Sequence, residues 1–246
     1  MNPSVDKRAL APKKKIVLIV LAVALLGGLG IVGYYQYAKT HYITTDDSRV
    51  AADLITIYPE IPGKLIEWRV KEGDSVTSNQ VLGRQDLGSV LTSGAISAQT
   101  MGTVGGVFAE KAQIKAPMAG LVIESSAVVG QMATPGAPLG VIADTGNLYI
   151  SANIKEDAIA HVRIGDRVDI AVDAFAGKAF HGEVETKGSA TVGTFSLLPS
   201  QNSGDNYTKV TQVIPIKIRL IDAGDVPLVV GMNSTVTIHI GSAHEK

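Results

Sequence analysis

The chain has no cysteine, so metal or nucleophilic chemistry would have to rest on histidine and carboxylate side chains. The five histidines are His41, His161, His181, His239 and His244. Their spacing along the chain matches no metal-ligand motif. The acidic residues Asp46, Asp47 and Glu67 have no sequence-linked base or nucleophile beside them. The sequence therefore predicts no metal site and no catalytic site.

A phosphate-binding loop is the next chemistry to consider, because residues 102–106 read Gly-Thr-Val-Gly-Gly. A phosphate loop would continue into Gly-Lys-Ser/Thr between a strand and a helix, and this segment does not. No Gly-x-Ser-x-Gly nucleophile elbow occurs either. We therefore predict a protein that is not an enzyme and that needs no cofactor.

One pattern occurs twice, and it defines the elements that any site would have to use. Gly63 and Gly120, Gly73 and Gly130, and Gly83 and Gly140 are each 57 residues apart. Each copy reads as a turn, a short apolar strand (64–66 or 121–123), a second turn and a last strand that ends at Leu-Gly. A four-strand half cannot bury both of its faces alone, so we expect the two halves to pack face to face in a sandwich.

Duplicated half-units of this kind also build biotinyl and lipoyl carrier domains, in which a lysine sits on the tight hairpin between the halves. Here the halves are joined by a long connector, and its only lysine, Lys111, lies at its far end. A swinging-arm carrier is therefore disfavoured.

The N-terminus reads as a membrane anchor. A basic tail, residues 1–15, precedes an apolar segment, residues 16–37, that ends in tyrosines. Its 22 residues would span about 33 Å as a helix, enough for a bilayer core of about 30 Å. The positive-inside rule places the tail in the cytoplasm and the bulk of the chain outside it. A cleaved signal peptide is the alternative, but this apolar run is longer than a signal core. Ala24 and Gly28 form a small-xxx-small pair that could contact another membrane helix.

The remainder predicts an all-β protein. The half-units occupy residues 45–86 and 112–147, and residues 87–111 form the connector, with a short helical stretch near 90–101. A small β-barrel is expected at 148–241, with strands at 148–150, 167–172, 180–184, 213–220 and 234–240. Residues 156–161 suit a helical turn, and residues 198–209 a polar exposed loop. A net charge of −1 argues against a nucleic-acid partner.

Several segments together resemble one protein family. They are Thr44 to Val50, Ile61-Pro62-Gly63, Val70 to Val76, Ile114 to Gly120, Phe195 to Pro199, Lys209 to Ile216 and Gly231-Met232. In this order they resemble the membrane fusion proteins, or periplasmic adaptors, of the haemolysin-secretion and EmrA-like multidrug-resistance branch.

The resemblance implies one transmembrane helix, a barrel-sandwich hybrid (lipoyl-like) domain and a β-barrel. It implies attachment to an exporter of the bacterial inner membrane, most often of the major facilitator type and alternatively of the ABC type, and a homo-oligomer as a further expectation. The family usually has a long helical hairpin between its half-motifs, whereas the connector here has 25 residues and no heptad stripe. A cell without a distant outer channel, a role confined to the inner-membrane transporter, or an experimentally shortened hairpin would each account for this.

The leading hypothesis is therefore an adaptor subunit for multidrug efflux or secretion, and the alternative is a membrane-tethered binding or scaffold module that is not coupled to transport. The residues expected to set the turns of the half-motifs are Pro62, Gly63, Gly73, Asp74, Pro117, Gly120 and Gly130. The residues expected to contact a partner or substrate are Ser97, Gln201, Asn202, Asn206 and Tyr207.

Overall fold

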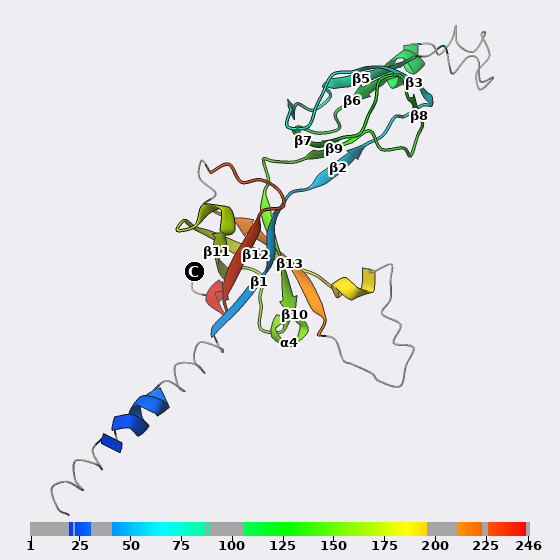
Figure 1. The fold of residues 1–246 in the computed structure, drawn as a ribbon. Coiled ribbons are helices and arrows are strands. Elements are labelled where there is room, and N and C mark those ends of the chain that lie inside the picture. Colours follow the sequence, from blue (N-terminus) through cyan, green and yellow to red (C-terminus); the bar gives the residue numbers. More distant parts are fainter. Residues whose placement is uncertain are drawn as a thin grey trace, which may run out of the picture.

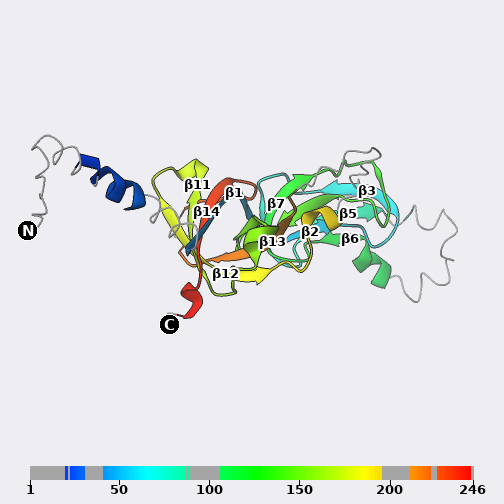
Figure 2. The same ribbon diagram turned by 90° about the horizontal axis from the view of Figure 1, so that it is seen from below.

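The computed structural model describes residues 20–21, 23–30, 41–86, 88, 106–195, 211–222 and 226–244. Its β-strands form two domains that lie end to end, a closed barrel and a sandwich (Figure 1). The helical residues 20–21 and 23–30 lie beyond the barrel, at the end opposite the sandwich (Figures 1 and 2). The predicted all-β class with a sandwich and a small barrel is confirmed.

The barrel is closed by six antiparallel strands in the order β1-β10-β13-β12-β11-β14. Their bounds are β1 Tyr42–Ala51, β10 Tyr149–Lys155, β11 Arg167–Val172, β12 Ala179–Lys187, β13 Val213–Leu220 and β14 Asn233–His239. Short helices lie between or after them: α4 Glu156–Ile159, η1 Asp173–Phe175, η2 Val192–Phe195 and η3 Ser242–His244. The strands expected at 167–172 and 213–220 are confirmed at the predicted bounds.

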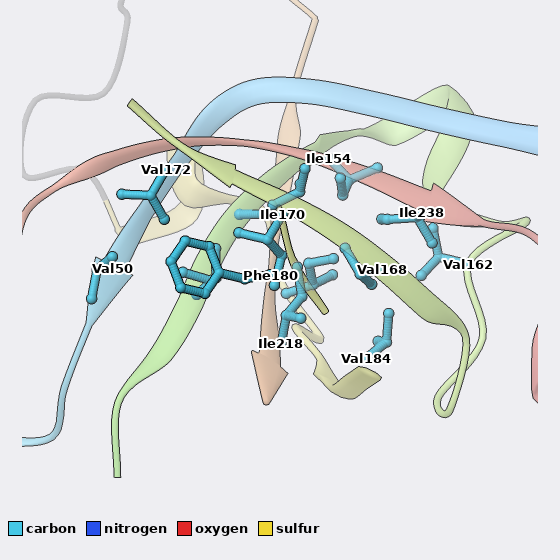
Figure 3. Close-up of a cluster of buried hydrophobic side chains, with 14 of the residues drawn as sticks. Val50, Ile154, Val162, Val168, Ile170, Val172, Phe180, Val184, Ile218 and Ile238 are labelled. Atoms are coloured by element: carbon cyan, nitrogen blue, oxygen red, sulfur yellow. The ribbon is translucent and has the colours of Figure 1, made fainter. Parts of the chain in front are cut away.

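Strict alternation of apolar and polar residues makes these strands two-sided. In β11 the side chains of Val168, Ile170 and Val172 are buried, and the residues between them are exposed. Figure 3 shows how such side chains from several strands meet inside the barrel around Phe180. The barrel therefore encloses a packed apolar core.

Strand β1 corrects the expected boundary of the first half-motif. Residues 45–51, assigned to the sandwich from the sequence, belong to the barrel, where β1 pairs with β10 and β14. The pairing with β14 is interrupted between Thr45 and Ser48, so Asp46 and Asp47 form a bulge. Without β1 the barrel could not close, because β10 and β14 would each keep an unpaired edge.

The sandwich consists of two four-stranded sheets, ordered β2-β9-β7-β4 and β6-β5-β3-β8. Their strands are β2 Leu54–Ile57, β3 Gly63–Trp68, β4 Ser75–Val76, β5 Val81–Asp86, β6 Gln113–Lys115, β7 Gly120–Ser125, β8 Met132–Ala133 and β9 Gly140–Ala143. Apolar side chains from both sheets, among them Leu65, Leu82, Val122 and Ile142, form one buried cluster between them.

The two halves are exchanged between the sheets, so the expectation that each half packs as a unit against the other is wrong. The first half supplies β2 and β4 to one sheet and β3 and β5 to the other, and the second half does the reverse. Adding 57 to the bounds of β3 and β4 gives β7 and β8, and adding 57 to those of β2 and β5 gives ranges that overlap β6 and β9, so each strand and its repeat equivalent lie in different sheets. Because β4 pairs with β7 and β8 with β3, backbone hydrogen bonds join the halves in both sheets.

Two segments connect the domains. Strand β1 leads into β2 through residues 52–53, and β9 leads into β10 through residues 144–148. The segments are hydrogen bonded to each other, since the Asp144 amide donates to the Asp53 carbonyl at 2.9 Å. Two chain segments, hydrogen bonded to each other, thus connect the sandwich to the barrel (Figure 1).

Two predicted helices lie partly or wholly outside the described residues. The connector helix expected near 90–101 falls outside them, although residues 106–111 are helical. Most of the predicted span, residues 16–37, falls outside them as well. Among the helices that the structure describes, none is long and apolar enough to cross a membrane.

Candidate functional site

The turns predicted from the repeat, at Gly73 and Gly130, each connect a strand of one sheet to a strand of the other. Gly73 has φ of 89° and Gly130 has φ of 97°, a left-handed backbone that favours glycine. The Gly73 amide donates to the Val122 carbonyl at 2.8 Å, and 57 residues later the Gly130 amide donates to the Leu65 carbonyl at 2.7 Å. The first turn is further closed by Asp74, whose carboxylate accepts from the Lys71 amide at 2.8 Å.

Gly63 and Gly120 act through close approach instead. A Cβ atom at Gly120 would overlap the Ala143 carbonyl oxygen, and one at Gly63 would lie 3.1 Å from the Asp86 carbonyl oxygen. Pro62 is exposed in the bend before β3, and Pro117 is exposed in the bend before β7. These predicted residues lie at sheet crossings and strand starts, with glycine required where backbones touch.

Gln85 is a structural residue of this region that the sequence analysis missed. Its side chain is buried, and its Nε2 donates to the carbonyls of Ile61 and Ala133 at 3.0 and 3.2 Å, with the Gly63 carbonyl at 3.3 Å. Its Oε1 is buried with no hydrogen-bond partner among the described residues. A comparison of the two copies of the repeat could have identified Gln85. The equivalent position 57 residues later is Ile142, so the polar side chain occurs only in the first copy, in β5.

A cavity of about 470 Å³ opens beside the point where the connector joins the sandwich. The helix at 106–111 covers one side of it and is anchored by Phe108, which packs on Ile61 and Ala112. Its lining residues are Tyr58, Glu60, Asn79, Val107, Glu110, Lys111, Gln113, Ile114, Lys115, Ala116 and Pro117. The predicted turn residue Pro117 therefore also faces this cavity.

Both cations of the cavity wall are paired. Lys111 lies 3.2 Å from a Glu60 carboxylate oxygen, and Lys115 lies 3.0 Å from one of Glu110. The Lys111 ammonium group is thus ion-paired at the C-terminal end of the helix at 106–111. The cavity can hold a ligand or side chain with both apolar and polar parts, because Tyr58 and Val107 offer exposed apolar surface beside the paired charges.

A second polar cluster lies on the outside of the barrel, and it joins histidines that are distant in sequence. Asp169 lies opposite His181 in the β11–β12 register, and its carboxylate is 2.7 Å from His239 Nε2 and 3.9 Å from His181 Nε2. His181 Nδ1 is 2.9 Å from Asp222. The hydrogen bond to Asp222 and the charges of Asp222 and Asp169 raise the pKa of His181, and the same hydrogen bond lowers the pKa of Asp222.

The acidic residues considered for catalysis make local contacts. Glu67 accepts from Arg69 Nε at 2.7 Å, and this hydrogen bond lowers the pKa of the Glu67 carboxyl. Asp47 in the β1 bulge accepts from Asn153 Nδ2 at 3.0 Å. Within the described ranges no group of three or more histidine and acidic side chains is arranged to hold a metal ion.

Of the residues predicted to contact a partner, only the two of the membrane helix lie within the described ranges. Ser97 and the loop residues Gln201, Asn202, Asn206 and Tyr207 all lie outside the described residues. Ala24 and Gly28 are described. Both are exposed in the helical segment 23–30, and outside the backbone of that helix no described atom lies within 4 Å of a Cβ placed at Gly28.

Comparison with known proteins agrees with this architecture. Residues 53–145 match the family described as RND MFP, barrel-sandwich hybrid domain. The efflux system component YhbJ of Bacillus subtilis is 35% identical over 200 residues, which cover 81% of this chain and 80% of YhbJ. The multidrug export protein EmrA of Escherichia coli is 33% identical over 133 residues, 53% of this chain but only 34% of EmrA. This chain thus spans most of one relative and about a third of the other.

The fold is also found among solved structures. A chimera of MacA that contains the α-hairpin domain of Pseudomonas aeruginosa MexA superposes with a TM-score of 0.61 at 17% identity, covering 82% of each chain. The exchanged sandwich, the closed barrel and the relationship to YhbJ over four fifths of both chains lead to one assignment. The chain belongs to the membrane fusion protein family, the periplasmic adaptors, and within it to the EmrA-like branch.

Proposed function

We propose that this protein is the adaptor subunit of a multidrug exporter and assists export across the cell envelope without chemistry of its own. The observation that carries the proposal is the sequence of parts: an apolar N-terminal segment, a barrel that begins directly after it, and a sandwich whose halves are split by a connector. The relatives named as an efflux component and a multidrug export protein support the same role.

The partner is an exporter in the bacterial cytoplasmic membrane, of the major facilitator type in preference to the ABC type. Residues 16–37 anchor the adaptor in that membrane as a single span, with residues 1–15 in the cytoplasm and both β domains outside it. Ala24 and Gly28, which are both exposed in the described structure, supply a small-residue face for a helix of the exporter.

The short connector limits how far the adaptor reaches. Two antiparallel helices that shared residues 87–111 would each be roughly 15 Å long at about 1.5 Å per residue. Such a hairpin cannot bridge a periplasm. The adaptor therefore works close to its exporter, and the cavity beside residues 106–111, together with Ser97 and the loop around Gln201 to Tyr207, is the candidate contact region.

The test is a crosslinked pull-down of the tagged full-length protein from its own membranes in mild detergent, followed by mass spectrometry. A co-purifying exporter in stoichiometric amount supports the adaptor. A matched chain in which an unrelated single span replaces residues 16–37 separates contacts of the helix from contacts of the β domains. Deleting the gene should lower drug export while the amount of exporter stays unchanged.

The competing function is a tethered binding or scaffold module, and the cavity of about 470 Å³ gives it a specific basis. A clean preparation without exporter, combined with unchanged export in the deletion strain, would contradict the adaptor and favour this module.

A further inference from the structure

One turn of the barrel presents a large apolar side chain to solvent on a rigid base. Ile164 is 66% exposed. The turn that carries it is held by Asp166, which is fully buried and whose carboxylate accepts from the amides of Arg163 at 2.8 Å and Gly241 at 3.1 Å. The adjacent Gly165 has φ of 89°, which shapes the turn. The backbone of the turn is thus fixed by hydrogen bonds while the Ile164 side chain projects into solvent. Ile164 is not part of the buried core of the barrel.

The position of this turn in the fold suggests what it meets. Strand β1 begins at Tyr42, and the carbonyl of His41 accepts from the Ile240 amide at 2.9 Å. The next residue, Gly241, donates to Asp166. The turn with Ile164 therefore lies at the end of the barrel where the chain arrives from the N-terminal segment, as the N-terminal helix in Figures 1 and 2 also indicates.

Chain length limits how far this end of the barrel can be from the bilayer. Only residues 38–41 separate the predicted span from β1. At about 3.6 Å per residue, the five steps from Tyr37 to Tyr42 cover at most about 18 Å. The headgroup region adds roughly 5–7 Å on each side of the hydrocarbon core. The end of the barrel must therefore sit close to the lipid headgroups.

The residues around Ile164 suit that surface. Arg163 and Arg167 flank the turn, and both are exposed. An apolar tip between two guanidinium groups is the pattern of an interfacial contact, in which the tip enters the headgroup layer and the cations meet phosphates. Glu156 and Asp157 of α4 lie at the same end of the barrel, so the apolar tip is needed as well as the charge.

We propose that the turn 163–167 docks on the surface of the anionic bilayer, with Ile164 in the headgroup layer and Arg163 and Arg167 on lipid phosphates, and so holds the barrel against the membrane. The inference depends on the anchor proposed above. It adds a second membrane contact, made by the barrel itself.

The chain supplies a matched control at the opposite end of the barrel. Ile221 follows β13 where that strand faces the sandwich, and it is 57% exposed, close to the value for Ile164. Because the chain has no cysteine, Ile164→Cys and Ile221→Cys each create a single labelling site. Arg49, exposed on β1 towards the sandwich, is the matching control for the arginines.

The experiment uses the full-length chain in nanodiscs of phosphatidylglycerol and phosphatidylcholine, with an environment-sensitive fluorophore on the cysteine and a nitroxide on the lipid headgroup. We expect quenching at position 164 to exceed that at 221 by about threefold or more, with blue-shifted emission. The double change Arg163→Glu and Arg167→Glu should abolish most of this difference, whereas Arg49→Glu should not. Circular dichroism of each variant checks that the barrel is folded.

Equal quenching at the two positions overturns the proposal and leaves the turn free for a protein partner. Quenching at 164 that survives reversal of both arginines overturns the phosphate contact. A protein that does not enter nanodiscs at all overturns the anchor and this inference together. The adaptor role is tested separately by exporter co-purification, so either result can fail without the other.

Discussion

Trp68 Nε1 donates a hydrogen bond to Ser125 Oγ at 2.9 Å, and these two residues are repeat equivalents, 57 positions apart. The last residue of β3 therefore touches the last residue of β7, its counterpart in the other sheet. The contact joins the two sheets where their equivalent strands end. It is an interaction between the copies of the repeat that neither copy could make alone.

Ser125→Ala should lower the unfolding free energy of the sandwich by about 1 kcal/mol, because the half-buried indole N–H loses its acceptor. Trp68 is the only tryptophan, so its fluorescence during urea unfolding reports on this domain. Ser126→Ala is the control, since its hydroxyl makes only an exposed 3.4 Å contact with the Pro138 carbonyl. Equal midpoints for the two variants would show that the bond across the sheets contributes nothing.

Gly120→Ala should destabilise the sandwich by about 1–3 kcal/mol, because the added methyl group overlaps the Ala143 carbonyl and forces the strands apart. Gly106→Ala, in the helix at 106–111, places its methyl group in open space and should be neutral or slightly stabilising. Thermal unfolding followed by tryptophan fluorescence compares them. A Gly120→Ala protein as stable as the parent would refute the close approach.

Asp166→Ala should lower the stability of the barrel by about 2–3 kcal/mol, since it removes the buried carboxylate that accepts hydrogen bonds from the Arg163 and Gly241 amides. Asp173→Ala, at an exposed position of η1, should change stability little. Differential scanning calorimetry measures both. The prediction fails if the two variants have the same midpoint.

The His181–Asp222 pair should make the barrel pH-sensitive. Because the folded pKa of His181 is raised, its contribution to stability is complete below about pH 6.5 and is lost as the pH rises through the folded value. The lowered pKa of Asp222 gives a contribution that is present above about pH 3.9 and is lost as the pH falls through its folded value. The pair therefore stabilises most in the mildly acidic range between these limits.

NMR titration of the His181 ring tests this directly. Asp222→Asn should bring the pKa of His181 down towards its ordinary value, because the main hydrogen bond to a charged acceptor is removed. Asp173→Asn changes an exposed carboxylate that does not contribute to the raised pKa of His181, so it should leave that pKa in place. An unshifted titration in Asp222→Asn would assign the raised pKa to another cause.

Gly28→Leu should weaken co-purification of the exporter, because a bulky side chain blocks close approach at the Ala24–Gly28 face. Gly27→Leu adds the same side chain one residue earlier, about 100° around the helix, and should have little effect. The structure leaves both positions with open space around them. Immunoblots of exporter recovered with each variant give the readout, and equal losses would argue against a specific helix face.

Local patterns were enough to predict much of the architecture. The alternation in residues 167–172 predicted β11 at its observed bounds. The constant offset of 57 predicted turns at Gly73 and Gly130 that share one geometry. Such features depend on neighbours within a few residues, so the sequence displays them directly.

Pairing between distant strands was decided only by the tertiary structure. The repeat indicated two related halves, yet nothing local told β4 to pair with β7 or β8 with β3, because short apolar strands accept several partners. Closure of the barrel requires β1, most of which the sequence had assigned to the first half-motif. Closure also places His181 and His239 on either side of Asp169. The sequence by itself determined the elements, the repeat and the family, whereas strand exchange, closure and the charged clusters arose from long-range backbone pairing that has no local signature.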